Sequence, residues 1–189
     1  MARFIALLDA SLLYSQRATN ITLHAAKARL FQPAWSAAIH DEWTRHLIKN
    51  RPHASPEGVA RRRAAMDRSF PGALVAEYEH LIEGIDLQDK DDRHVVAAAI
   101  KARADVIVTF NTKHFPNDEL EKHGLEAQHP DTFLVHQLTL DPRAFLQCVR
   151  KARQQLVRPP YTAVEFLEGL RKANLPILAH ELARDADSI

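Results

Sequence analysis

Two short apolar runs, each followed by a polar side chain, constrain the fold of this 189-residue chain most strongly. The first, at residues 4–8, ends at Asp9; the second, at residues 105–110, is rich in Val, Ile, Thr and Phe and leads to Asn111. Such runs, alternating with helical segments, predict an α/β fold with a parallel sheet of about four or five strands flanked by helices. Because open sheets of this class bind ligands at their carboxyl edge, we expect Asp9 and Asn111 at a functional site.

Most of the remaining sequence has helical character. Ser36 is a good N-cap residue, and Pro56 suits the first turn of a helix because its backbone angle is already helical. Ile85 and Leu87 predict a further short strand. The expected helices cover residues 12–30 with a polar break, 37–49, 56–70, 74–82, 92–103, 131–138, 142–157 and 162–173, with one more after Pro176.

Bulk composition places the chain among soluble proteins of the cytoplasm. It is 46% hydrophobic and 26% charged, which is ordinary for a globular protein. Cys148 is the only cysteine, so an internal disulfide is impossible, as suits a reducing compartment. We expect no signal peptide and no membrane helix, since no apolar stretch approaches the roughly 20 residues required. With a net charge of +1, nucleic-acid binding would have to depend on local patches.

Three acids are candidates for one divalent metal site: Asp9, Glu42 and Asp92. A carboxylate that ends a buried strand is costly unless something pairs with it, although Asp9 could equally cap the next helix. Glu42 borders the buried stripe of its expected helix, where a solvated side chain is the usual alternative. Helix capping explains one of Asp89, Asp91 and Asp92, but not all three together, because like charges repel. Oxygen ligands of this kind suit Mg²⁺.

Other catalytic chemistries have weaker support. The pairs His40 and His46, or His94 and His114, could be zinc ligands, but the tight Cys/His spacing of zinc sites is absent. Ser11 lacks the glycine-flanked turn of a catalytic serine. With five glycines and no glycine-rich phosphate loop, a dinucleotide-binding or P-loop enzyme is disfavoured.

A basic stretch lies in the two helices around the second candidate acid. It is interpreted either as a solvated helical face or as a track for a phosphate backbone that leads to the acidic site. Its members are Arg45, Lys49, Arg51, Arg61, Arg62, Arg63 and Arg68.

Four motifs, in the same order along the chain, resemble PIN-domain ribonucleases and in particular the VapC-like toxins. They are Leu-Asp-Ala-Ser at residues 8–11, the segment 33–43 with its His-Asp-Glu-Trp end, Asp-Asp-Arg-His and the alanine-rich run after it at 91–99, and Val-Thr-Phe-Asn-Thr-Lys-His-Phe-Pro at 108–116. The set is similar to the subgroup with the Asp-Asp-Arg-His signature. The resemblance covers roughly residues 3–138 and implies a PIN-like nuclease domain at 1–138. Residues 139–189 would form a helical C-terminal extension, with a break at Pro159 and Pro160.

Carried over to this chain, the resemblance implies that Asp9, Glu42 and Asp92 hold Mg²⁺, with Mn²⁺ as the alternative. Asn111 stands where many relatives have a fourth acid, so it would position water or a second, weaker ion; Asp118 is a less favoured substitute. The expected substrate contacts are Thr109, Arg45, His46 and Arg93.

The function implied by the resemblance is that of a Mg²⁺-dependent endoribonuclease, the toxin of a type II toxin–antitoxin pair. RNA would be the substrate and a small DNA-binding antitoxin the partner, and a homodimer is compatible with this reading. Two alternatives stay open: a PIN-fold module that binds RNA or serves as a scaffold without cleaving, and a metal-dependent phosphatase or DNA nuclease.

Overall fold

The computed structural model describes residues 4–156 and 160–189. The chain forms two compact units, each built from two stretches of sequence. Unit 1 comprises Met1–Tyr14 and Gln32–Gln128, and unit 2 comprises Ser15–Phe31 and His129–Ile189. The break at Pro159 lies outside the described residues, and the expected boundary between residues 138 and 139 stays a prediction.

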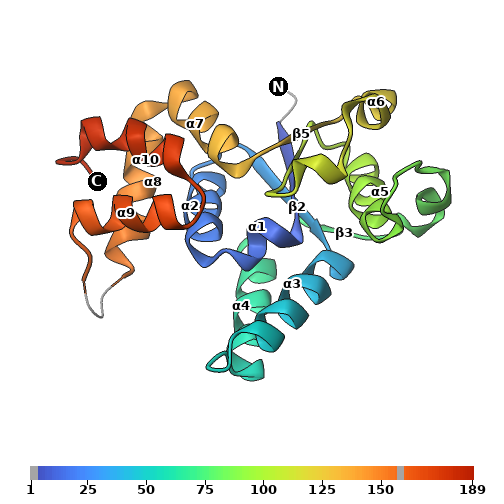
Figure 1. Cartoon of the computed structure of the whole chain (residues 1–189), viewed down its shortest axis with the longest axis horizontal. Coiled ribbons are helices and arrows are strands. Elements are labelled where there is room, and N and C mark those ends of the chain that lie inside the picture. Colours follow the sequence, from blue (N-terminus) through green and yellow to red (C-terminus); the bar gives the residue numbers. More distant parts are fainter. Residues whose placement is uncertain (1–3, 157–159) are drawn as a thin grey trace. The chain divides into compact units, whose positions relative to one another are not determined.

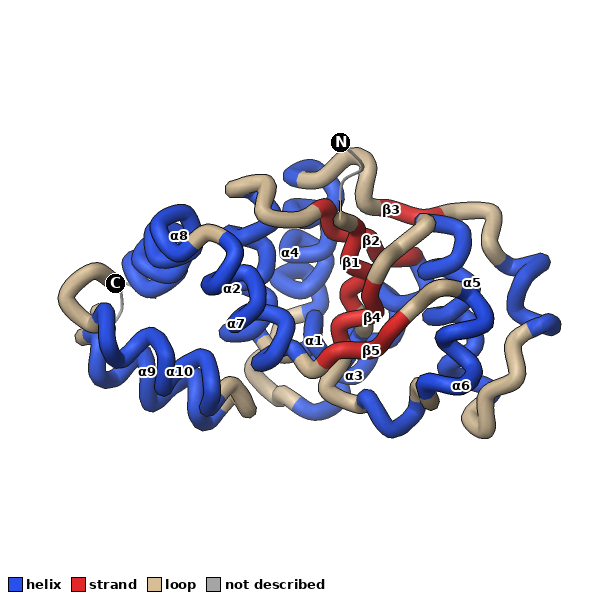
Figure 2. The backbone as a smooth tube through the Cα atoms, turned by 90° about the horizontal axis from the view of Figure 1, so that it is seen from above, coloured by secondary structure: helices blue, strands red, loops and turns tan. Residues whose placement is uncertain are grey.

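Unit 1 contains a five-stranded sheet in which every neighbouring pair is parallel. The strand order is β3-β2-β1-β4-β5; Figure 1 labels β2, β3 and β5, and Figure 2 labels all five strands in this order. The predicted α/β class is therefore confirmed. The strands are β1 (Ile5–Leu8), β2 (Gln32–Ser36), β3 (Leu74–Val75), β4 (Val106–Val108) and β5 (Glu126–Gln128).

The strand order brings the carboxyl ends of β1 and β4 together. From β1 the chain proceeds to β2 and β3 on one side, then crosses to β4 and β5 on the other. Leu8 pairs with Val108, so Asp9 and Thr109 directly follow two paired residues at the same edge. Such a reversal of strand order is where open parallel sheets bind ligands.

Helices and short 3-10 turns flank this sheet. In Figure 2, α5 lies on one side of the strands and α4 on the other. Ser36 caps α3 by accepting a hydrogen bond from the Ile39 amide at 3.2 Å, as predicted, and Ser55 caps α4 at the predicted Pro56 start. The helices of unit 1 are α1 (Ala10–Tyr14), α3 (Ala37–Asn50), α4 (Pro56–Ser69), α5 (Arg93–Ala102) and α6 (Asn117–Leu120), and the 3-10 turns are η1 (Glu79–Gly84), η2 (Lys90–Asp92), η3 (Thr112–His114) and η4 (Glu121–His123).

The expectations for residues 74–87 are wrong. The predicted helix at 74–82 is replaced by the edge strand β3 and then η1. Ile85 and Leu87 are not in a strand; both are buried side chains of the loop that leads to η2. Burial without a sheet partner produces the same alternating apolar pattern as a strand, which is why the sequence misled here.

A partly buried polar network joins α3 to α4. Trp43 donates its indole N–H to His40 Nδ1 at 2.8 Å, so the ring proton of a neutral His40 lies on Nε2, 3.1 Å from Asp67 Oδ1. Trp35 donates to the same oxygen of Asp67 at 2.9 Å. Burial lowers the pKa of His40, and the Asp67 charge opposes that shift. These bonds fix the orientation of α3, the helix that carries Glu42.

Unit 2 is helical, as expected for the C-terminal region. Phe31 and Phe133 pack edge to face with ring centroids 4.9 Å apart. The buried Asp131 accepts the Ile177 and Leu178 amides, both at 2.8 Å, and so caps α10 from a distant position in the sequence. Its elements are α2 (Gln16–Lys27), α7 (Pro130–Leu140), α8 (Pro142–Gln154), α9 (Ala163–Lys172), α10 (Pro176–Leu182) and the 3-10 turn η5 (Ala183–Asp185).

Within residues 4–156 and 160–189, no helix combines the length and apolar character that crossing a membrane would require.

Candidate metal centre

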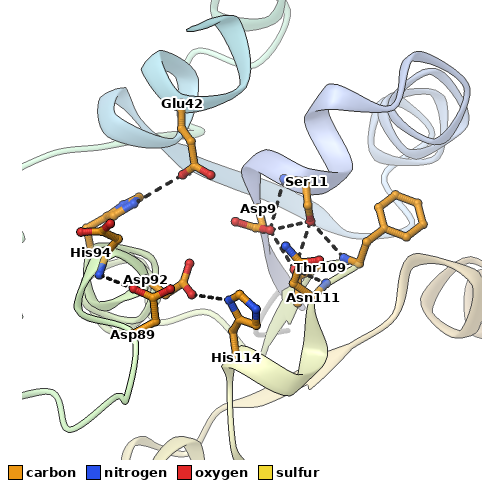
Figure 3. Close-up of polar contacts among 11 residues, drawn as sticks. Asp9, Ser11, Glu42, Asp89, Asp92, His94, Thr109, Asn111 and His114 are labelled. Carbon is orange, nitrogen blue, oxygen red and sulfur yellow. Dashed lines mark hydrogen bonds and ion pairs between the residues drawn. The ribbon is translucent and has the colours of Figure 1, made fainter. Parts of the chain in front are cut away.

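Asp9 lies at the carboxyl end of β1 and is only 5% exposed. Its Oδ2 atom accepts three hydrogen bonds: from the Ser11 amide at 3.2 Å, the Ser11 hydroxyl at 2.6 Å and the Thr109 hydroxyl at 2.8 Å. The Ser11 amide bond shows that Asp9 does cap α1 through Oδ2. The capping alternative therefore accounts for one of the two carboxylate oxygens. Among the described residues, Oδ1 accepts no hydrogen bond, and Figure 3 shows it directed away from the Ser11–Thr109 side.

Ser11 and Thr109 form a small polar network that ties the ends of β1 and β4 together. Their hydroxyl oxygens are 3.1 Å apart, and each also accepts a backbone amide: Phe110 on Ser11 and Asn111 on Thr109, both at 3.0 Å. Thr109 is fully buried. The network holds the Asp9 carboxylate in one orientation, which a buried acid needs if its second oxygen is to serve a ligand.

Glu42 faces the same space from α3. Its Oε2 atom is 3.7 Å from His94 Nε2, on the first turn of α5. Figure 3 shows the carboxyl groups of Asp9, Glu42 and Asp92 pointing toward a common space from three different elements. The three acids proposed as metal ligands thus face one space, although their ligand atoms do not all lie within 4.8 Å of one another, and their role stays a prediction.

The tightest set of donors is a different one. Among the described residues, Asp89, Asp92 and His114 are the group whose ligand atoms all lie within 4.8 Å of one another. His114 Nδ1 is 2.7 Å from Asp92 Oδ2. Asp92 therefore belongs to both sets, and Figure 3 shows Asp89 and His114 flanking it from two different sides.

Asp92 is only half-buried, yet its environment opposes a negative charge. Burial raises the pKa of Asp92, while the hydrogen bond and the charge of His114 lower it. The charges of Asp89 and Asp9 raise it further. A cation beside Asp92 would favour the charged carboxylate and so oppose this rise in its pKa.

The other predicted site residues fall into two groups. Asn111 is exposed, and its backbone amide bonds Thr109 beside the acids; Arg45 and His46 are exposed on α3, one turn beyond Glu42. Arg93 is directed elsewhere: its guanidinium donates to the Leu87 carbonyl at 3.3 Å and holds the loop before η2.

Three members of the basic stretch make contacts within the protein. Arg62 donates to the Leu13 carbonyl at 2.6 Å and lies 4.7 Å above the Trp43 ring, and burial lowers its pKa to about 10. Arg63 pairs with Asp41, and Arg51 stacks 5.4 Å from the Tyr14 ring centroid. Arg45, Lys49, Arg61 and Arg68 are exposed.

Sequence reasoning gave Ser11, Asp89, His94 and His114 no positive role. Ser11, His94 and His114 do lie inside the matched motifs, which was the only signal available for them. Carboxylate oxygens with an imidazole nearby are donors that divalent cations accept, so the residues present fit such an ion.

Comparisons with known proteins agree with the α/β fold. The PIN domain family model matches residues 6–113, more than half of the chain, and the VapC50 C-terminal domain model matches residues 130–184. The protein named "Putative ribonuclease VapC50" of Mycobacterium tuberculosis is 42% identical over 98 residues, 52% of this chain. The match covers 57% of that relative, less than two thirds of its length. No solved structure matches. The chain belongs to the PIN-domain family and resembles VapC-like proteins that carry a helical C-terminal extension.

Proposed function

We propose that this protein is a metal-dependent endoribonuclease. The observation that carries the proposal is the convergence of Asp9, Glu42 and Asp92 at the carboxyl edge of the sheet, with one oxygen of Asp9 held and the other left open. Buried carboxylates without a compensating partner are unfavourable, and a divalent cation is the partner that such a set suits.

Each acid has its own local support in this proposal. Ser11 and Thr109 hold Oδ2 of Asp9, so only Oδ1 faces the centre. Glu42 is set by α3, whose orientation depends on the partly buried His40–Asp67 contact. When bound, Mg²⁺ or Mn²⁺ would lower the pKa of a coordinated water and neutralise charge on the scissile phosphate. By analogy with other metal nucleases, in-line attack would leave a 5′-phosphate and a 3′-hydroxyl.

RNA would approach along the exposed side of α3. Residues three, four and seven positions after Glu42 are Arg45, His46 and Lys49, and this spacing puts them on one helical face. All three are exposed. The face supplies positive charge next to an acidic centre that would otherwise repel a phosphate backbone.

We also propose that the protein is the toxin of a type II pair in the cytoplasm, silenced by a small antitoxin. The likeness to the Mycobacterium tuberculosis relative supports this. Expression without a partner should then stop bacterial growth, and Glu42→Ala should relieve the arrest. Growth arrest of equal severity in the Glu42→Ala strain would show that the toxicity is not nucleolytic.

A second candidate is a PIN-fold module that binds RNA or acts as a scaffold without cleaving it. Asn111 favours this candidate, because it is an exposed amide at the position where the family resemblance implies a fourth acid. The two candidates differ in a single measurement, the turnover of RNA.

The deciding experiment is RNA cleavage by purified protein with Mg²⁺ or Mn²⁺, comparing wild type with Asp9→Asn. Asp187→Asn is the matched control, since it removes one exposed carboxylate from unit 2. Cleavage by wild type and by the control, but not by Asp9→Asn, supports the nuclease. RNA binding without cleavage in all three supports the non-cleaving module.

A further inference from the structure

We propose that His114 is a nitrogen ligand of the metal centre and, with Asp89 and Asp92, forms a second ion position that prefers Mn²⁺ to Mg²⁺. This inference deepens the proposed function and rests on its metal requirement. It assigns the role of the missing fourth acid to residues other than Asn111.

The backbone places Asp89 and Asp92 on the same side of η2. Asp89 is the N-cap of this 3-10 turn and Asp92 its last residue. The Asp92 amide donates to the Asp89 carbonyl at 3.4 Å, and a carboxylate oxygen of each acid lies within 4.8 Å of the other. Asp89 uses Oδ1 to accept the Asp91 amide at 2.9 Å, which fixes its rotamer. The pair is therefore oriented before any ligand arrives.

His114 reaches this pair from the opposite side. It is the last residue of η3, which begins at Thr112, after residues 109–111 that follow β4, and is closed by the His114 amide donating to the Asn111 carbonyl at 3.0 Å. The same short turn exposes residue 111 and aims the imidazole of residue 114 at Asp92. This turn therefore brings the imidazole of His114 next to Asp92.

The donor types decide which ion is preferred. Mg²⁺ demands oxygen ligands and near-octahedral geometry, whereas first-row transition ions also accept imidazole nitrogen. A set of two carboxylates and one imidazole therefore lowers the relative affinity for Mg²⁺. Asp92 belongs to this set and also faces the space shared with Asp9 and Glu42. It would therefore contact both ions, as expected where two ions act on one phosphate.

The test measures metal binding without RNA, by calorimetry with Mn²⁺ and Mg²⁺ and by electron paramagnetic resonance of bound Mn²⁺. Wild type should show nitrogen hyperfine coupling to Mn²⁺. Losing a direct ligand should weaken Mn²⁺ at least as much as losing an outer-shell partner does, about 10- to 100-fold. His114→Asn should therefore lose the nitrogen coupling and bind Mn²⁺ more weakly by this factor, while its affinity for Mg²⁺ changes little. His53→Asn, an exposed histidine in the loop after α3, is the matched control and should resemble wild type.

A second variant covers the possibility that the first does not fold. His114→Asp replaces nitrogen by oxygen and should abolish the coupling while strengthening Mg²⁺ binding. The proposal is overturned if wild type shows no nitrogen coupling, or if the coupling persists in His114→Asn, since His94 would then be its source. Equal weakening of both ions in His114→Asn also overturns it, because His114 would then act only by orienting Asp92. This test does not depend on RNA cleavage. A protein that fails to cleave RNA but shows nitrogen coupling from His114 would refute the nuclease and leave this inference standing.

Discussion

Two buried aspartates, one in each unit, differ in what their carboxylates contact. Asp131 in unit 2 is 2% exposed, and each of its oxygens accepts one backbone amide of α10. Asp9 in unit 1 is 5% exposed, but all three of its hydrogen bonds go to Oδ2. Both acids cap a helix. Only Asp9 keeps an oxygen directed at other acids, so saturation of the carboxylate, and not its burial, separates a structural aspartate from a candidate ligand.

The largest expected effect is on cleavage by Asp9→Asn. The amide oxygen can take the position of Oδ2 and keep the bonds from Ser11 and Thr109, which leaves the NH₂ group facing the metal centre. We expect cleavage to fall by about 10²- to 10³-fold or more, as when one charge-stabilising group is removed from an active site. Initial rates on RNA with Mn²⁺ would measure this. The free energy of unfolding should change by about 1 kcal/mol or less.

Asp131→Asn should show the reverse pattern. Its amide can accept only one of the two α10 amides, and its NH₂ group must face the other donor. We expect a loss of about 1–3 kcal/mol in the stability of unit 2, the usual result of leaving a buried donor unsatisfied. Hydrogen exchange at the Ile177 and Leu178 amides would report it directly. Unchanged protection at these amides, or a loss of metal binding, would break the comparison between the two aspartates.

A third buried acid, Glu119, is paired with Lys122. Its contribution to the stability of unit 1 should depend on pH. Its hydrogen bond from Lys122 and the Asp86 amide hold the pKa of Glu119 at about 2. Because this folded-state pKa is below the ordinary value of 4.5, the carboxylate stabilises unit 1 above pH 4.5, and the stabilisation is lost as the pH falls from 4.5 toward 2.

Thermal melting of wild type and Glu119→Gln across this range tests the sign. The difference in melting temperature between wild type and Glu119→Gln should be largest at neutral pH. It should shrink toward zero at the acidic end of this pH range. A difference that is constant with pH would mean that Glu119 contributes through packing and not through its charge.

The sequence predicted those elements whose signals are local. β1 and β4 are apolar runs, and Ser36, Ser55 and Asp141 accept amides at the starts of α3, α4 and α8. Edge strand β5 was missed, because Glu126–Gln128 has a single apolar residue and exists as a strand only through its pairing with β4. Propensity cannot reveal such a partner-dependent strand.

The same distinction holds for the site. Asp9, Glu42 and Asp92 lie in recognisable motifs, and the structure brings them to one space, although their roles as ligands stay predictions. The pairing of Asp92 with His114 joins residues 22 positions apart and depends on how η3 turns after β4. The joining of residues 15–31 with 129–189 in unit 2 is likewise a packing result that no local pattern encodes.

The smallest expected effect is that of Asn111→Asp, which adds a carboxylate two residues after Thr109, beside the acids. Residue 111 is exposed and its backbone amide already bonds Thr109, so the substitution should not disturb the fold. Hard cations respond to ligand charge, and we expect Mg²⁺ to bind up to about tenfold more tightly by calorimetry. The cleavage rate need not rise, because tighter binding of the ground state does not by itself stabilise the transition state. If the affinity is unchanged, residue 111 lies outside the metal's ligands. A metal bound to the open oxygen of Asp9 would then have Glu42, Asp92 and the residues beyond Asp92 as its other ligands. This result would sharpen the contrast with the saturated carboxylate of Asp131.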